Sequence, residues 1–217
     1  MNSNIPKHKI ESKISQEEIE QIKKKVRLSE DSELFVSTDL FHIFTKQVQL
    51  FNNQTTKFEY LVRKPTVSVI AITQDNKLIV LHQQQPGVSS FIDFPSGSLD
   101  SYYEDELDAI QRELLEETGM ISDDIFKLKK VRVNDIILWD HTIFIARNCK
   151  KIKDLNLDAG EKIRVELREI DEIFEIINLP DFRDLNLQAE VNSYLICDKK
   201  KKEFLELLKY QNLKLEK

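Results

Sequence analysis

Three glutamates that lie close together in the chain are well suited to do chemistry. Glu113, Glu116 and Glu117 stand at positions i, i+3 and i+4, and at about 100° per helical residue they fall within an arc of roughly 100°. Their charges repel one another, and a helix dipole disfavours anions near its C-terminal end. A bound cation would offset both penalties, and Mg²⁺ prefers oxygen ligands that it bridges to phosphates. The spacing therefore predicts a Mg²⁺ site for phosphoanhydride chemistry, with Mn²⁺ as the alternative ion; the structural alternative is a solvated helix face.

The glutamates lie in a segment that is predicted to be a helix from Glu104 to Thr118. Leu107, Ile110 and Leu114 share one face of this helix. Gly119 follows where a left-handed residue commonly ends a helix. The periodicity therefore places the glutamates beside an apolar stripe that faces the core.

Residues around the glutamates favour a functional site over a solvated face. Three residues stand at fixed offsets from the glutamates. A turn that allows close approach of the backbone is expected at Gly97, a charge partner at Arg112 and the end of the helix at Gly119. With these residues in place, the segment from Gly97 to Met120 resembles a Nudix box. Its family pattern is Gly, five residues, Glu, seven residues, Arg-Glu, an aliphatic residue, any residue, Glu-Glu, any residue, Gly and an aliphatic residue. The matching residues are Glu104, Arg112, Glu113, Leu114, Glu116, Glu117, Gly119 and Met120, with one extra residue between Gly97 and Glu104.

The resemblance implies a pyrophosphohydrolase that cleaves a nucleoside diphosphate linked to another group, and it implies roles for individual residues. Its metal ligands would be Glu113, Glu116, Glu117 and the carbonyl group of Ser96.

The other catalytic roles also come from the resemblance. Arg112 would orient the glutamates, and Glu104 would support the start of the helix. A downstream acidic loop of the family resembles residues 158–161 here, which makes Glu161 the leading candidate for a base or extra metal ligand. Asp158 and Glu116 stay open as alternatives for the base.

The substrate class rests on the segment Asp93–Gly97, which is similar to the Glu-any-Pro-Ala-Gly lead-in of ADP-ribose and ADP-sugar pyrophosphatases. The resemblance therefore favours ADP-ribose or another ADP-sugar as the small nucleotide substrate. A hairpin upstream of the fold also looks like theirs, and in those enzymes it packs on a second subunit, which implies a homodimer. The chain departs from them at Gln83–Gln85, where an aromatic residue and an arginine are usual.

Several residues outside the helix are candidates for binding the substrate. Arg63 and His82 would line the cleft, because nucleotides in this family lie across the sheet near such positions. Trp139 could stack on an adenine, with core or interface packing as the alternative. The predicted substrate-binding set is Arg63, His82, Gly97, Trp139 and Asp158.

Further polar residues have both a functional and a structural interpretation. His141 could act as a general base, or it is a partly exposed strand residue. Arg132 and Arg147 could supply counter-charge to phosphates. The run Lys199–Lys202 is typical of a solvated face.

The remaining pattern predicts an α/β or α+β sandwich with a mixed central sheet, of the Nudix type by resemblance, preceded by an N-terminal hairpin. Residues 1–63 would form the dimerising extension and residues 64–217 the hydrolase domain. A capping box at Ser15–Glu18 predicts a short first helix. The other predicted elements are strands at 41–51, 56–62, 66–73, 77–82, 127–133, 136–146 and 163–167, a loop at 148–162 and helices near the end.

Composition limits the possible partners. The formal net charge of −6 argues against non-specific nucleic-acid binding, so a polyanionic substrate needs a local counter-charge. No apolar run approaches the roughly 20 residues that cross a bilayer, and no secretory signal is visible. Cys149 and Cys197 are the only cysteines and are predicted to be buried thiols, which fits a reducing cytoplasm.

The sequence leaves alternatives open. Within the same enzyme class the substrate could be a dinucleoside polyphosphate, NADH, a GDP-sugar or capped RNA. From another class, the chain could be a nucleotide-sensing module that has kept the fold without turnover, although the intact glutamates argue against it. Isoprenoid diphosphate isomerisation would need additional cysteine and glutamate machinery that the chain does not visibly supply.

Overall fold

The computed structural model describes residues 14–157 and 159–210. It divides into two compact units, of which the first comprises the described residues up to Pro65 together with Arg132–Asp140, and the second the rest.

The first unit is a four-stranded sheet with one helix, α1 (Gln16–Val26). The helix starts at Ser15, whose side chain accepts a hydrogen bond from the Glu18 N–H, as the capping box predicts. Its apolar residues Ile19, Ile22 and Val26 are buried. The sheet has the order β1-β2-β3-β10, with strands β1 (Glu33–Ser37), β2 (Phe41–Gln49), β3 (Thr55–Arg63) and β10 (Ile137–Leu138).

Strands β2 and β3 form the expected N-terminal hairpin, and they pair in register from Phe41↔Arg63 to Gln49↔Thr55. Strand β1 was not predicted. The predicted strand 136–146 is in fact two strands, because β10 pairs in parallel with β3 in the first unit while the following residues start β11 in the second.

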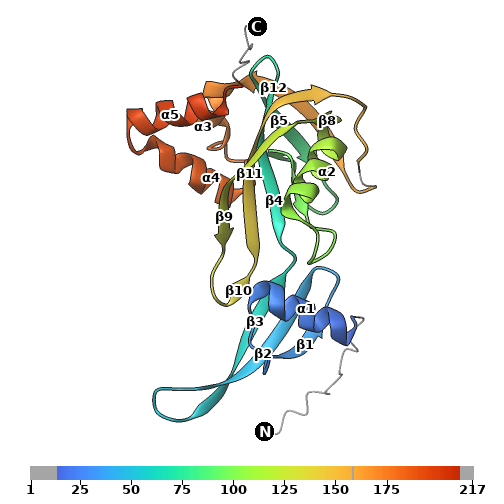
Figure 1. Ribbon diagram of the computed structural model, residues 1–217, viewed down its shortest axis with the longest axis vertical. Helices are drawn as coiled ribbons and strands as arrows, with labels where there is room; N and C mark the ends of the chain where they lie inside the picture. The colour runs from blue at the N-terminus through green and yellow to red at the C-terminus, as the bar shows by residue number, and fades with distance from the viewer. Residues whose placement is uncertain (1–13, 158, 211–217) are drawn as a thin grey trace, which may run out of the picture. The chain divides into compact units, whose positions relative to one another are not determined.

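The second unit is a mixed eight-stranded sheet with helices on both faces (Figure 1). Five of its strands are hydrogen-bonded in the order β12-β5-β4-β11-β8. Of the other three, β6 pairs with β5, β7 with β4 and β9 with β11. Only β4 and β11 run parallel among the register-defined pairs, so the sheet is mixed, as predicted. The strands are β4 (Thr66–Thr73), β5 (Lys77–Gln84), β6 (Phe91–Asp93), β7 (Ser96–Ser98), β8 (Met120–Ile121), β9 (Asp124–Arg132), β11 (Asp140–Lys151) and β12 (Lys162–Glu169).

Two apolar clusters cover the two faces of this sheet. Alternate residues of β4 face opposite ways: Val69 packs in the cluster with Ile110 and Leu114 of α2 (Glu106–Thr118), and Ile70 in the cluster beneath the C-terminal helices. These helices are α3 (Ile173–Ile176), α4 (Leu185–Asn192) and α5 (Asp198–Leu208), with 3₁₀ turns at Ile170–Glu172 and Ser193–Ile196. The observed order of layers confirms the predicted sandwich.

Several local predictions need correction. Consecutive strands β4 and β5 pair antiparallel beside their turn, at Ile72↔Leu78, and farther from the turn β7 pairs with β4 and β6 pairs with β5. The loop predicted from residue 148 begins later, since β11 continues to Lys151 past a register shift. Cys149 is buried as predicted, whereas Cys197 is exposed, so that half of the thiol prediction is wrong. In the described part of the chain, no helix has the length and apolar character needed to cross a membrane.

Candidate active site

Helix α2 carries the glutamate cluster, and two residues set its limits. Asp105 has an extended backbone, and its side chain accepts a hydrogen bond of 2.8 Å from the Leu107 N–H, so the helix starts at Glu106 instead of the predicted Glu104. At the other end Gly119 is left-handed, with φ 70°. A Cβ at Gly119 would lie 2.0 Å from the Lys153 carbonyl oxygen, so the helix ends where another segment crosses it closely.

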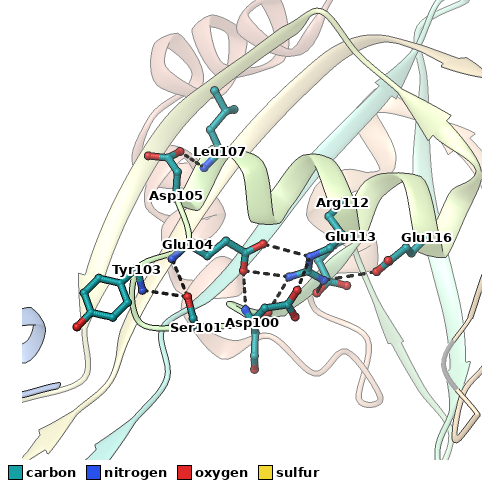
Figure 2. Close-up of polar contacts among 10 residues, drawn as sticks. Asp100, Ser101, Tyr103, Glu104, Asp105, Leu107, Arg112, Glu113 and Glu116 are labelled. Atoms are coloured by element: carbon teal, nitrogen blue, oxygen red, sulfur yellow. Dashed lines mark hydrogen bonds and ion pairs between the residues drawn. The ribbon is translucent and has the colours of Figure 1, made fainter. Parts of the chain in front are cut away.

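Arg112 lies at the centre of the acidic side chains (Figure 2). Its Nε donates to Glu104 Oε1 at 3.2 Å, and its guanidinium contacts Glu113 Oε1 at 2.7 Å and Glu116 Oε2 at 3.4 Å. A fourth bond reaches the Ser98 carbonyl oxygen at 3.1 Å. The arginine therefore ties the loop before α2 to the glutamate face of the helix, which is the arrangement expected of a residue that orients carboxylates.

The loop before α2 closes on itself through Glu104. Its carboxylate accepts a hydrogen bond of 2.5 Å from the Asp100 N–H, and its own N–H donates to Ser101 Oγ at 3.1 Å. Because α2 begins two residues later, Glu104 is free of the helix and spans from the loop to Arg112 (Figure 2).

Glu117 is buried at the end of the cluster, with 3% of its surface exposed. Its Oε2 accepts a hydrogen bond of 2.8 Å from the Ser96 N–H, which joins α2 to β7. Burial raises the pKa of Glu117 well above its usual range, and the nearby charges of Glu113 and Glu161 raise it further. A negative charge here is therefore costly unless a cation accompanies it.

Glu113 shares this environment. Burial raises its pKa to about 7 although Arg112 acts in the opposite direction, and the charges of Glu116 and Glu161 add to the rise. Gly97 makes room for this carboxylate, because a Cβ at position 97 would lie 1.9 Å from Glu113 Oε1. The predicted close-approach glycine therefore lies against the predicted metal-ligating side chain.

These residues fit a divalent cation by their chemistry. The donors are hard carboxylate oxygens, they are withdrawn from water, and one arginine does not balance their charge. In the described ranges, however, no three His, Cys, Asp or Glu side chains already form a group that could hold a metal ion. Arg112 instead binds oxygens of Glu113 and Glu116, and the Ser96 N–H binds one of Glu117.

The segment after β11 is bound to the C-terminal end of α2. The Ile152 N–H donates to the Gly119 carbonyl oxygen and the Asn156 N–H to the Glu116 carbonyl oxygen, each at 2.9 Å. These carbonyl groups have no partner within the helix, so the crossing segment satisfies them. Glu161 follows in the same segment and acts electrostatically on the cluster, whereas Asp158 lies outside the described residues.

The other predicted substrate residues contact neighbours outside α2. His82 at the end of β5 is paired with Glu166 of β12. Arg63 and Trp139 belong to the first unit, where the guanidinium of Arg63 lies 4.6 Å from the ring centre of Trp139. Arg63 therefore supports the indole ring directly, which favours the packing interpretation of Trp139 at this contact.

The expected partial exposure of His141 is wrong. His141 is 4% exposed instead of partly exposed. Its ring contacts Thr66 Oγ1 at 2.7 Å, Ser68 Oγ at 3.0 Å and Asp184 Oδ2 at 3.0 Å, so it joins β4 to the cap of α4 inside the core. Nothing in this sequence pattern indicated Asp184 as the partner.

The two arginines that were expected to balance the phosphate charge each bind an aspartate of the chain. Arg132 binds Asp140 through two bonds of 2.6 and 3.1 Å, and Arg147 binds Asp124 through two of 2.8 and 3.0 Å. Lys199 in the first turn of α5 is 84% exposed, as expected of a solvated face.

Known proteins give an independent view of this fold and site. A family model described as the NUDIX domain matches residues 62–189, more than half of the chain. The chain therefore belongs to the NUDIX domain family, as the resemblance of the glutamate segment implied.

Individual relatives are more distant. Over 73 residues the chain is 40% identical to a "Methanol dehydrogenase activator" of Bacillus methanolicus, covering 33% of this chain and 39% of the relative. Over 97 residues it is 30% identical to an "ADP-ribose pyrophosphatase" of Bacillus subtilis (strain 168), covering 44% of this chain and 52% of the relative. The chain thus spans about half the length of these curated relatives or less. A crystal structure of an "ADP compounds hydrolase" shares the fold, with a TM-score of 0.62, 20% identity and coverage of 82% of this chain and 92% of that one.

Proposed function

We propose that the chain is a Mg²⁺-dependent pyrophosphohydrolase that splits ADP-ribose or another ADP-sugar into AMP and a sugar phosphate. The observation that carries the proposal is the burial of Glu113 and Glu117 beside the Gly97 turn, where further carboxylates raise the pKa values of both. Membership of the NUDIX domain family and the similarity to an ADP-ribose pyrophosphatase support the same activity.

The roles of individual residues follow from this geometry as part of the proposal. Glu113, Glu116, Glu117 and the Ser96 carbonyl group would hold Mg²⁺ or Mn²⁺, which when bound neutralises the diphosphate charge. Arg112 would hold the carboxylates of the helix face in place until the substrate arrives.

The hydrolytic step needs a base near the cluster. In the proposed step a water oxygen forms a bond to one phosphorus, the bond from that phosphorus to the bridging oxygen breaks, and the water proton passes to the Glu161 carboxylate. The bridging oxygen leaves with the other phosphate and Glu161 then releases its proton to solvent, so that AMP, the sugar phosphate and the released proton account for all atoms of the substrate and the water. Glu161 is favoured because its charge acts on both Glu113 and Glu117.

The surroundings of the enzyme belong to the same proposal. The N-terminal unit, with its β2–β3 hairpin, would join two copies into a homodimer, and two free cysteines fit the cytoplasm. Substrate-binding roles for Arg63, His82 and Trp139 are likewise proposals.

The test is a substrate panel with AMP detection. We expect hydrolysis of ADP-ribose with Mg²⁺ and none with excess EDTA, and slower turnover of NADH, GDP-sugars, dinucleoside polyphosphates and capped RNA. Release of AMP that is independent of the divalent cation would contradict the proposal.

A regulatory role is the second candidate, and one observation favours it. The relative with 40% identity carries the name of an enzyme activator. A sensing module would bind ADP-ribose in calorimetry and release no AMP after long incubation with Mg²⁺, whereas the enzyme would consume it.

A further inference from the structure

A cavity of about 290 Å³ lies at the edge of the second unit where β5 ends and β12 begins. Its walls come from β5, the start of β6, the start of β12 and the segment around Asp181, and the lining residues are His82, Gln83, Gln84, Ser90, Phe91, Lys162, Ile163, Arg164 and Asp181. The volume lies at the lower limit of small-molecule sites, which begin at about 300 Å³. The cavity therefore suits one part of a nucleotide sugar instead of the whole molecule.

The cavity lies at the same end of the sheet as the glutamate cluster. Strands β4 and β5 are antiparallel, so β5 ends where β4 begins, and the start of β4 pairs with Gly97 in β7. Lys162 in the cavity wall directly follows Glu161, whose charge acts on Glu113 and Glu117. A substrate whose diphosphate lies at the cluster can therefore place its other half toward this cavity.

The cavity wall is held in position by the backbone. The Ile92 N–H donates to the Asp181 carbonyl oxygen at 2.9 Å, and the Arg183 N–H donates to the Ile92 carbonyl oxygen at 3.0 Å. The Arg183 guanidinium lies 4.4 Å from the ring centre of Phe91 and donates to Gln85 Oε1 at 3.1 Å. These contacts restrain the exposed side chain of Arg183 beside Phe91, which lines the cavity.

Positive charge dominates this wall in a chain with a formal net charge of −6. Lys162, Arg164 and Arg183 are exposed cations around it. The Glu166 carboxylate is already shared by His82 and by Arg168 at 3.3 Å. Arg164 also lies 3.8 Å from a Glu166 carboxylate oxygen, so its charge is partly balanced. Lys162 and Arg183 then face Asp181 as the acidic group of the cavity lining. Such a local excess attracts phosphate and not a neutral sugar.

We propose that this cavity binds the half of the substrate remote from the adenosine and selects one that carries a phosphate of its own. The inference rests on the proposed pyrophosphohydrolase function and refines its substrate class to nucleoside diphosphate sugars with an additional phosphate on the sugar. Lys162 and Arg183 are the residues that determine this specificity.

The experiment compares two substrates that differ by one phosphate, ADP-ribose and ADP-ribose phosphorylated on its terminal ribose. In the wild-type protein we expect kcat/KM to be about tenfold higher for the phosphorylated compound, mostly through KM, which corresponds to one charge-assisted contact. Lys162→Gln and Arg183→Gln should each weaken this preference, the double variant should abolish it, and Arg183→Lys should retain part of it. Hydrolysis of ADP-ribose should fall by a smaller factor than hydrolysis of the phosphorylated compound, so the ratio of the two kcat/KM values is the readout.

The control is Lys129→Gln, which removes an equally exposed lysine of β9 that does not line the cavity. It should leave the preference unchanged. The proposal would be overturned if the wild-type protein did not prefer the phosphorylated compound, or if the double variant kept that preference. It would also be overturned if the variants lost kcat/KM equally for both substrates.

Binding separates this inference from the proposed function. Calorimetry with the same two nucleotides in EDTA measures the ratio of their Kd values without turnover. If neither compound is hydrolysed, the proposed function fails, while a tenfold ratio of Kd that the double variant removes still supports the cavity. If ADP-ribose is hydrolysed and the Kd ratio is one, only the cavity proposal fails.

Discussion

Glu106 in the first turn of α2 and Glu117 in its last turn are the same residue type on the same helix, and both are largely withdrawn from water. Their surroundings differ in charge. Glu106 contacts Lys127 at 2.7 Å and Lys130 at 2.6 Å, both from β9. Glu117 has one backbone N–H, from Ser96, and two further glutamates close by.

The pKa shifts of the two ends of the helix follow from this difference. At Glu106, burial raises the pKa, but the hydrogen bonds and charges of the two lysines outweigh it and lower the pKa to about 2. At Glu117, burial and like charges raise the pKa well above its usual range. The chain therefore supplies its own cations where a glutamate holds the helix in place, and leaves the charge unbalanced where an external cation is expected to bind.

The strongest test of this contrast replaces Glu117 by Gln. The amide keeps the size of the side chain and an oxygen for the Ser96 N–H, but it removes the charge. If Glu117 holds the divalent cation, we expect kcat/KM for ADP-ribose to fall roughly 100- to 1,000-fold. The measurement is AMP release at saturating Mg²⁺.

The thermal stability of Glu117→Gln provides a second measurement. In EDTA we expect Glu117→Gln to unfold at a Tm no lower than the wild type, because the variant has lost a poorly compensated buried acid. Mg²⁺ should raise the Tm of the wild type and not of the variant, since only a bound cation stabilises the folded state. Full activity in the variant would refute the metal-binding role of this end of α2.

The next test acts on the space around the cluster. In Gly97→Ala the three atoms nearest to the added Cβ all belong to the end of the Glu113 side chain, with Oε1 at 1.9 Å. The carboxylate can swing away, so the fold should persist while the ligand geometry is lost. We expect kcat/KM to fall about 100-fold, the effect of a displacement of roughly 1 Å in an active site.

Gly87→Ala serves as the comparison for this variant. Gly87 has φ 79° but nothing within 4 Å of its would-be Cβ, so the change strains the backbone without touching the cluster. It should lower the Tm and leave kcat nearly unchanged. If Gly97→Ala behaved in the same way, the close approach to Glu113 would have no functional meaning.

Features of this helix could be predicted from the sequence where the interacting residues are close together along the chain. The limits of α2, its apolar stripe and the shared face of its glutamates follow from residues within one or two turns, as Ile110, Leu114 and Gly119 show. The start was misplaced by two residues because Asp105, not an earlier residue, provides the cap.

Contacts between distant segments were beyond reach of the sequence. Lys127 and Lys130 lie 21 and 24 residues from Glu106, and no local pattern links them to it. The pairing of His141 with Asp184 and of β10 with β3 depends in the same way on how strands are ordered in the sheets. The sequence and the family resemblance pointed to Ser96, Gly97 and the glutamates, whereas the structure shows which contacts join them: the Ser96 N–H to Glu117, and Gly97 against Glu113.

The smallest expected effect concerns the first turn of α2 and also provides the control for the proposed metal-binding end of this helix. In Glu106→Gln the contacts with Lys127 and Lys130 lose their charge, and because both lysines are about half exposed we expect a loss of about 1 kcal/mol in the free energy of unfolding at pH 7. The kcat should stay within about threefold of the wild type, since hydrophobic packing of Ile110 and Leu114 still holds the helix.

The pH dependence of that loss follows from the direction of the shift. The folded pKa of Glu106, about 2, is below its ordinary value of 4.5, so the carboxylate stabilises the fold above pH 4.5 and this stability disappears as the pH falls toward 2. Urea unfolding of the wild type and the variant should therefore differ at pH 7 and converge near pH 2 to 3. A difference that persisted at low pH would mean that Glu106 acts through packing and not through its charge, and the electrostatic contrast between the two ends of α2 would then rest on Glu113 and Glu117 alone.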